Sequence, residues 1–460
     1  MSTLLRQLLF GFAVSLCLVV PGVAEPQKLS PDDLRAAAQR AFEQGHFDVA
    51  FQAALALLER DGEDSQALAV LSQLERLTGQ FSKARTTARL AWQHAQNDTQ
   101  KYGAAMARAQ VLASSGNRTM AQFWLRRAAE HAPTQGHAAV AREDFRYVRA
   151  RNRLNLNFQL AVSPVSNINN GSKRSTGVFE LPIFGVVEAE LSGTGRALSG
   201  TEFLVGLAGR YRLRHTPGRN QTDLQLSASH RSYTLSSSAK ALAPTAKGSD
   251  FSFADVQARL VHRGRTGGQE ATPFQLSAAL GQTWHGNAPY TRYTDLEATQ
   301  TWAGQTQSFR LTAGARQDRS AVTSSQDALK GRVALSWMRI VGENNRLTLS
   351  VQGQSSSSDD INLEFQETGI GAQWSFGRPI LSMDLGLGLN LSKRTYDQGP
   401  IAGQDRQDVS AEIAATATLR DFEMYGFMPT VTVTARQTES DFDQYDADEF
   451  GLRLGLRSSF

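Results

Sequence analysis

The chain has 460 residues, of which 41% are hydrophobic, and its 48 Lys and Arg nearly balance 44 Asp and Glu, for a net charge of +4. This length exceeds one ordinary domain, and the sequence has no clustered basic stripe, which argues against a nucleic-acid partner. The mean hydropathy of −0.34 does not exclude a membrane barrel, because only every second residue of a barrel strand faces lipid.

Residues 1–24 are expected to form a secretory signal peptide. Arg6 provides positive charge, residues 8–20 form a short apolar segment, and small residues precede a cleavage site after Ala24. Cys17, the single cysteine, lies in the middle of this segment. The mature chain would therefore lack disulfides, thiol catalysis and cysteine-bound metal, as suits a protein exported to the periplasm.

Residues 25–150 are expected to form a domain of helical repeats. A pattern of small residues, glycine and an aromatic residue occurs twice, with Gly45 and Gly79 34 positions apart, and a weaker copy surrounds Gly116. This period is typical of tetratricopeptide repeats, in which glycine turns one helix back onto the next. The expected packing positions are Gly45, Phe47, Ala50, Gly79, Phe81, Ala84, Gly116 and Ala121. Such a domain binds segments of other proteins; the alternative is a plug or spacer.

Residues 151–460 alternate apolar and polar residues, which predicts long strands rather than helices. About fourteen strands are expected, the even number typical of bacterial outer-membrane barrels. They lie near 153–163, 201–214, 221–235, 251–263, 273–284, 292–303, 307–318, 328–340, 345–355, 363–376, 379–394, 407–420, 427–438 and 447–460. Connections alternate between tight turns and longer polar loops, except that 264–272 is no shorter than 285–291. Residues 178–191 are not counted as a barrel strand, on grounds of parity.

The charged residues of the polar faces are expected to line a wet lumen, since an arginine at mid-depth on the lipid face would cost ~2–4 kcal/mol. They include Arg210, Arg212, Arg259, Arg310, Arg316, Arg332, Asp384 and Glu412. The last strand has Phe450, Leu452, Leu454, Leu456 and the terminal Phe460 on one face. A final strand that ends on phenylalanine resembles the signal bound by the barrel-assembly machinery.

No arrangement of residues in the sequence indicates an enzyme, a metal site or a cofactor. The nucleophile-elbow, zinc-protease and phosphate-loop motifs do not occur, and the histidines of the barrel region have no metal-ligand spacing. The acidic run of Asp441, Asp443, Asp446, Asp448 and Glu449 is interpreted as a solvated outer loop rather than a cation site.

The segment 154–171, LNLNFQLAVSPVSNINNG, is similar to the start of the barrel in the family of surface lipoprotein assembly modulators. The order of parts and the approximate barrel size also match that family. The resemblance implies an outer-membrane translocator, and within the motif Pro164, Asn167, Asn169 and Asn170 are candidates for contact with substrate. The alternative is that these asparagines only shape the first outer loop, because asparagine side chains form turns and tolerate left-handed backbone.

The resulting hypothesis is a monomeric Gram-negative outer-membrane barrel with its helical domain in the periplasm. It would deliver lipoproteins or soluble binding proteins to the cell surface, the repeats recruiting the substrate or its chaperone. The alternative is a channel or exporter for polysaccharide or small solutes, and a surface enzyme or adhesin is a third candidate. Its expected partners are outer-membrane lipid, the barrel-assembly machinery and the exported protein.

Overall fold

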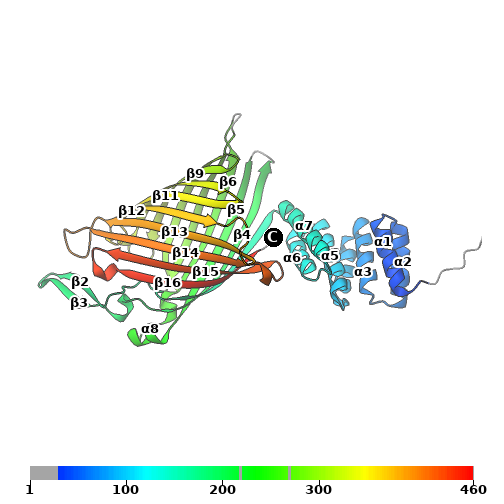
Figure 1. Ribbon diagram of the computed structural model, residues 1–460, viewed down its shortest axis with the longest axis horizontal. Coiled ribbons are helices and arrows are strands. Elements are labelled where there is room, and N and C mark those ends of the chain that lie inside the picture. Colours follow the sequence, from blue (N-terminus) through cyan, green and yellow to red (C-terminus); the bar gives the residue numbers. More distant parts are fainter. Residues whose placement is uncertain (1–28, 217–219, 268–270, 459–460) are drawn as a thin grey trace, which may run out of the picture. The chain divides into compact units, whose positions relative to one another are not determined.

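The computed structural model describes residues 29–216, 220–267 and 271–458 (Figure 1). The predicted signal peptide, Cys17 and Phe460 lie outside these residues. The chain divides into two compact units, one up to Ala95 and one from Gln96 onward. No helix among the described residues is long and apolar enough to cross a membrane.

The first unit consists of two helical hairpins whose helices cross at small side chains. Ala50 and Ala84 are fully buried, and Gly45 and Gly79 occupy left-handed turns with φ of 81° and 78° that reverse the chain between the paired helices. Ser30 accepts the N–H of Asp33 at the start of the first helix. The helices are α1 (Pro31–Glu43), α2 (Phe47–Arg60), α3 (Ser65–Leu77) and α4 (Phe81–Gln93).

The second unit begins with three more helices, α5 (Asp98–Ser114), α6 (Arg118–Glu130) and α7 (Gln135–Arg151). Gly116 repeats the left-handed turn, with φ of 89°, and Ala121 is fully buried. The helical region ends at Arg151 and the first strand begins at Leu154. The second compact unit contains α5 to α7 together with the barrel, and α6 and α7 contact a turn of the barrel. The predicted domain boundary at residue 150 stays a prediction.

The strands after α7 form a closed antiparallel barrel of fourteen strands, in the order β1-β16-β15-β14-β13-β12-β11-β10-β9-β8-β7-β6-β5-β4. This architecture confirms the predicted fold class. The strands are β1 (Leu154–Val165), β4 (Gly200–Thr216), β5 (Asn220–Leu235), β6 (Phe253–Arg265), β7 (Pro273–His285), β8 (Ala288–Ala303), β9 (Gln307–Ser320), β10 (Ala328–Val341), β11 (Asn345–Ser358), β12 (Phe365–Ser375), β13 (Met383–Tyr396), β14 (Arg406–Leu419), β15 (Phe427–Ser440) and β16 (Ala447–Ser458).

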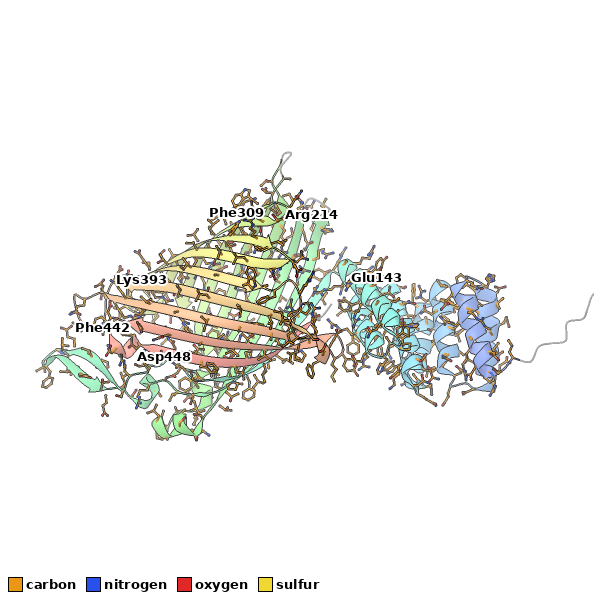
Figure 2. The ribbon with its side chains drawn as sticks, in the orientation of Figure 1. Glu143, Arg214, Phe309, Lys393, Phe442 and Asp448 are labelled. Atoms are coloured by element: carbon orange, nitrogen blue, oxygen red, sulfur yellow. The ribbon has the colours of Figure 1, made fainter. Side chains whose placement is uncertain are left out.

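Exposed apolar side chains alternate along these strands with half-buried polar ones. In β9, for example, Phe309 and Leu311 are exposed while Thr312 is half-buried. Phe309 and Lys393 lie on the outward face (Figure 2). An apolar outer surface on a closed barrel is the architecture of an outer-membrane protein. We call the end where β1 begins and β16 finishes the helical end, and the opposite end the loop end.

Two local predictions are corrected and one is confirmed. The loop expected at 285–291 is a tight turn at Gly286 and Asn287, whose φ values of 56° and 67° fit a two-residue hairpin. The strand expected from 379 begins at Met383, because Leu381 has a φ of 50° and lies in the preceding turn. The exclusion of residues 178–191 from the barrel is confirmed: they fall in β2 (Thr176–Leu181) and β3 (Gly185–Glu190), which form a separate two-stranded sheet.

Replacing Ala84 with leucine should destabilise the helical unit. Ala84 is fully buried at a helix crossing, and overpacking such a site costs ~1–3 kcal/mol. Urea unfolding of the full chain, followed by helical circular dichroism, should show an earlier transition. The matched control is Arg89→Leu, which adds the same side chain at an exposed position of α4. Equal effects of the two variants would contradict close packing at Ala84.

Candidate functional site: the lumen and the two ends of the barrel

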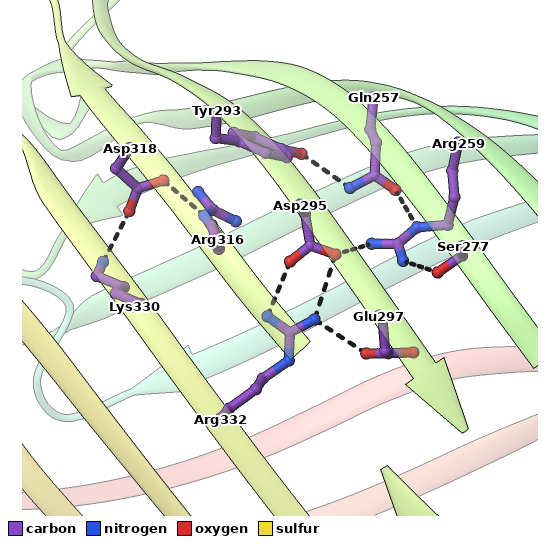
Figure 3. Close-up of polar contacts among 10 residues, drawn as sticks. All are labelled: Gln257, Arg259, Ser277, Tyr293, Asp295, Glu297, Arg316, Asp318, Lys330 and Arg332. Atoms are coloured by element: carbon purple, nitrogen blue, oxygen red, sulfur yellow. Dashed lines mark hydrogen bonds and ion pairs between the residues drawn. The ribbon is translucent and has the colours of Figure 1, made fainter. Parts of the chain in front are cut away.

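The lumen is lined by charges that are paired with each other (Figure 3). Asp295 accepts hydrogen bonds from both Arg259 and Arg332, at 3.1 Å and 2.8 Å. Arg332 also donates to Glu297 at 2.9 Å. Asp295 is only 3% exposed, and two cations beside it offset the cost of burying its charge. A second group nearby joins Asp318 to Arg316 and Lys330.

At the loop end the lumen contains a cavity of about 330 Å³. Arg406 forms one side, with its guanidinium 3.5 Å from the ring centre of Tyr396 and 3.8 Å from that of Tyr445. Arg394 is paired with Glu367. The first loop is the segment 166–199 between β1 and β4. Its residues 169–172 form the wall opposite Arg394, Tyr396 and Arg406. The first loop therefore reaches the lumenal strands β12 to β14.

The asparagines of the sequence motif hold this first loop together. The side chain of Asn167 is buried and bonds both the N–H and the C=O of Gly171, at 2.9 Å and 2.8 Å. Asn169 donates to the carbonyl oxygens of Thr194 and Arg196 and accepts the N–H of Leu198. These contacts favour the loop-shaping alternative for Asn167 and Asn169. Contact with a substrate stays a prediction.

The other two motif residues shape the backbone. Asn170 is exposed and has a φ of 50°, a left-handed conformation that asparagine tolerates. Pro164 is exposed in β1 opposite Thr201 of β4, and it provides no N–H to either neighbouring strand.

The first loop is fastened to the last one, 441–446. Arg174 pairs with the buried Asp446 at 3.0 Å, and this hydrogen bond, with the carboxylates of Asp443 and Asp448, raises the pKa of Arg174. The side chain of Gln444 bonds the N–H and the C=O of Val178. Asp446 is thus a buried ion-pair partner, which corrects its interpretation as part of a solvated run. No group of acidic or histidine side chains in the described chain is arranged to hold a metal ion.

The hairpin of β2 and β3 carries an exposed apolar tip. Ile183 is 87% exposed and Phe184 is 75% exposed. Exposed apolar clusters of this kind mark surfaces that bind other molecules. Figure 1 shows the hairpin projecting beyond the loop end of the strands.

The seam between β1 and β16 is paired along only part of its length. Its partners are Ala161 with Gly455, Val162 with Leu454, and Val165 with Gly451. On its other side β1 is matched to β4 from Leu154 to Val165 without interruption. In this register Phe158, Gln159 and Leu160 lie opposite Ser458, Arg457 and Leu456, and no ladder pair joins these positions. Leu156 and Asn157 lie opposite residues 460 and 459, which are outside the described residues. Among the described residues, the seam next to the helical end therefore lacks ladder pairs from Phe158 to Leu160.

Helix α6 contacts both sides of the seam at the helical end. Arg126 donates to the hydroxyl of Ser458 at the end of β16 and to the carbonyl oxygen of Gly426, both at 2.7 Å. Glu130 accepts the N–H of Tyr425 at 2.7 Å. On the β1 side, Thr119 of α6 accepts a hydrogen bond from Asn152, two residues before β1. Burial, and then repulsion by Arg149, lowers the pKa of Arg126 to about 10, so it remains a cation near neutral pH.

The remaining predicted positions are placed as follows. Phe450, Leu452, Leu454 and Leu456 alternate in β16 with Gly451, Arg453 and Gly455, and Arg453 bonds Ser163 across the seam at 3.3 Å. Phe81 is half-buried. Phe47 is 45% exposed, with its ring centre 5.8 Å from that of Phe42.

Sequence reasoning missed Arg126, Glu130 and the turn that holds Tyr425 and Gly426. No motif marks them, because the contact joins positions about 300 residues apart. Pro164 accounts only for the gap at residues 163–164, between the paired Val162 and Val165, since proline interrupts ladders.

Comparison with known proteins gives no family. No family model matches the chain, and no curated protein matches it. Among solved structures, the Yersinia enterocolitica type III secretion translocator chaperone SycD shares 18% identity over 27% of this chain and 88% of its own, with a TM-score of 0.23. The TPR2B domain of yeast Sti1 shares 15% identity over 26% of this chain and 98% of its own, with a TM-score of 0.23. Acinetobacter baumannii OccAB4 shares 7% identity over 66% of this chain and 98% of its own, with a TM-score of 0.34. Similarities this low carry no functional argument.

Replacing Asn169 with alanine should loosen the first loop without unfolding the barrel. The change removes three hydrogen bonds, each worth ~1 kcal/mol. Limited proteolysis should cut between 166 and 199 at least about 10-fold faster than in wild type, while the heat-dependent gel shift of the barrel persists. Asn170→Gly is the control, because glycine accepts the same backbone. Unchanged cleavage together with lost function would favour a substrate contact instead.

Replacing Asp295 with alanine should destabilise the barrel by about 3 kcal/mol, since it leaves Arg259 and Arg332 facing each other without a shared partner. Urea unfolding followed by tryptophan fluorescence measures the change. The control is Glu343→Ala, which breaks the exposed pair with Arg378 and should cost ~0–1 kcal/mol. A loss as small as that of the control would show that the lumenal network contributes no stability.

Proposed function

We propose that this protein is an outer-membrane translocator that delivers a lipoprotein or a soluble binding protein from the periplasm to the cell surface. In this proposal the helical end faces the periplasm and the helices recruit the substrate or its chaperone. The barrel provides the route, and no bond is made or broken. The resemblance of segment 154–171 to surface lipoprotein assembly modulators supports this choice of substrate.

The observation that carries the proposal is the incomplete seam between β1 and β16. A lipoprotein that passed through a closed lumen would have to draw its acyl chains through a polar interior. At ~0.8 kcal/mol for each CH₂ group removed from apolar surroundings, one chain of about 16 carbons costs roughly 13 kcal/mol. A barrel that opens sideways allows the chains to stay in the bilayer while the polypeptide crosses.

The contacts of α6 supply a control for such an opening. Arg126 holds the end of β16, and Thr119 holds the residues before β1. Part of the seam therefore depends on a helix rather than on a strand ladder. A substrate that binds the helices and displaces these contacts would release the seam. At the opposite end, the exposed tip at Ile183 and Phe184 offers an apolar surface to an emerging protein.

The alternative is a channel or exporter for polysaccharide or solutes. It is favoured by the polar lumen and by the cavity of about 330 Å³ at the loop end. An exporter of anionic polymer needs a surplus of positive potential along its path. Arg259, Arg316 and Arg332 are instead neutralised by acidic partners, so this reading has less support.

A disulfide across the seam tests the translocator. Val162 and Leu454 are directly opposite each other, and the only native cysteine is Cys17 in the predicted signal peptide. We expect Val162→Cys with Leu454→Cys, when oxidised, to lower surface labelling of the exported protein to the level of a deletion strain. A membrane-impermeant biotin reagent on whole cells, with mass spectrometry of captured lipoproteins, measures this. Reductant should restore labelling, because the lock is reversible.

The matched control is Val431→Cys with Leu454→Cys, which links the same residue of β16 to β15, where the strands are paired throughout. This variant should label like wild type. Normal labelling in the oxidised seam variant would eliminate a sideways route. If deletion changes the surface exposure of no protein but abolishes solute conductance or polysaccharide release, the channel is correct and the translocator is wrong.

A further inference from the structure

Two arginines lie directly opposite each other on the outward face of the barrel. Arg292 of β8 is the cross-strand partner of Arg319 of β9, and the next pair along the ladder is Tyr293 with Asp318. Tyr293 and Asp318 are buried and point into the lumen (Figure 3), so the arginines on either side of them point outward. Both are exposed. Like charges in this position repel each other, and within the described residues neither arginine has an acidic partner in an ion pair.

Both arginines line a groove of about 1200 Å³ on this outward face. Val256, Ala258 and Leu280 form its apolar part, and Trp284 and the loop segment 320–324 also line it. Asp327 contributes the single carboxylate, which accepts the N–H of Ser320 at 2.7 Å. The groove thus combines a cationic pair with an aromatic side chain and apolar walls.

The ladder between β8 and β9 places the arginines at the membrane surface. Its outward pairs after Arg292 and Arg319 are Thr294 with Gln317, Leu296 with Ala315, Ala298 with Ala313, Gln300 with Leu311, and Trp302 with Phe309. Ten residues at ~3.3 Å each, tilted by ~40°, rise roughly 25 Å, the height of the apolar band of such barrels. The aromatic pair therefore marks one interface and the arginine pair the other, at the loop end.

Below the arginines the outward wall is hollowed by small side chains. A second groove, of about 960 Å³, is lined by Ala298, Ala313, Ala315 and Gly331, between Leu276 and Val333. Leu296 and Ala315 of this groove are two ladder positions from Thr294 and Gln317 of the first. A trough of this kind accommodates acyl chains directly beneath the cationic pair.

We propose that Arg292 and Arg319 bind the phosphate group of a phosphorylated, acylated glycolipid of the outer leaflet. A phosphate between the two guanidinium groups accepts charge-assisted hydrogen bonds from both and removes their repulsion. Trp284 is placed to pack against the sugar, and the trough takes the acyl chains. This proposal rests on the orientation proposed above, with the loop end outside, and it is independent of any exported protein.

The test uses the folded full chain, purified in detergent and stripped of lipid, with native mass spectrometry and thermal unfolding as readouts. Lipid A carrying phosphate should bind at least about 10-fold more tightly than dephosphorylated lipid A, and raise the unfolding temperature more. Arg292→Gln with Arg319→Gln should remove that difference, since each charge-assisted bond lost weakens binding about 10-fold or more. Ala298→Phe, which fills the trough and keeps both arginines, should also weaken binding.

Two controls remove an outward-facing cation elsewhere. Lys393→Gln acts at the loop end, where the partners of Lys393 are Thr368 and Val409. Arg339→Gln acts at the helical end, opposite Gln307 and Leu347. Both should bind like wild type. Equal binding of the two lipid forms, or unchanged binding by the double arginine variant, would overturn the proposal. Competition by inorganic phosphate at the same concentration as the lipid would show a free-anion site and overturn it as well. A failure of surface delivery leaves every one of these results unaffected.

Discussion

Every backbone N–H and C=O group within the hydrocarbon of a membrane must be bonded inside the protein, because lipid offers no partner. Closure of the strands into one barrel meets this requirement along β1 and β4, where each position from Leu154 to Val165 is matched. Among the described residues, the edge between β1 and β16 has ladder pairs only at Ala161, Val162 and Val165. The described positions without a pair are thus the least bonded part of this edge, and Arg126 and Thr119 of α6 make contacts on its two sides.

Charged side chains are neutralised in different ways on the inner and outer surfaces of the barrel. Inside, Asp295 is placed between two arginines, and the charges neutralise one another where water is limited. Outside, Arg292 and Arg319 face each other, and neither has an acidic partner in an ion pair within the part of the chain that the structure describes. One arrangement stabilises the protein by itself, whereas the other gains its stability from an anion that the membrane supplies. The pairing of charges therefore distinguishes structural positions from binding positions.

The sequence predicted those features that depend on a local period. Fourteen strands follow from two-residue alternation, and the left-handed turns at Gly45, Gly79 and Gly116 follow from the repeat. That the asparagines of the motif shape the first loop was one of the two predicted alternatives, since short amide side chains bond nearby backbone. By contrast, the contact of Arg126 with Gly426 and the facing of Arg292 toward Arg319 depend on register between distant segments. Alternation gives the face of a residue but not its cross-strand partner.

The position of α6 links the helices to the wall thermodynamically. If Arg126 and Thr119 hold the seam closed, a ligand that prefers the helices without these contacts stabilises the open seam. By reciprocity, opening the seam then strengthens the binding of that ligand by the same factor. A protein at the helices and the passage beside them would therefore favour each other, whereas a solute that enters only the lumen has no such coupling. The contacts of α6 at the seam are therefore what distinguishes the two proposed functions in thermodynamic terms.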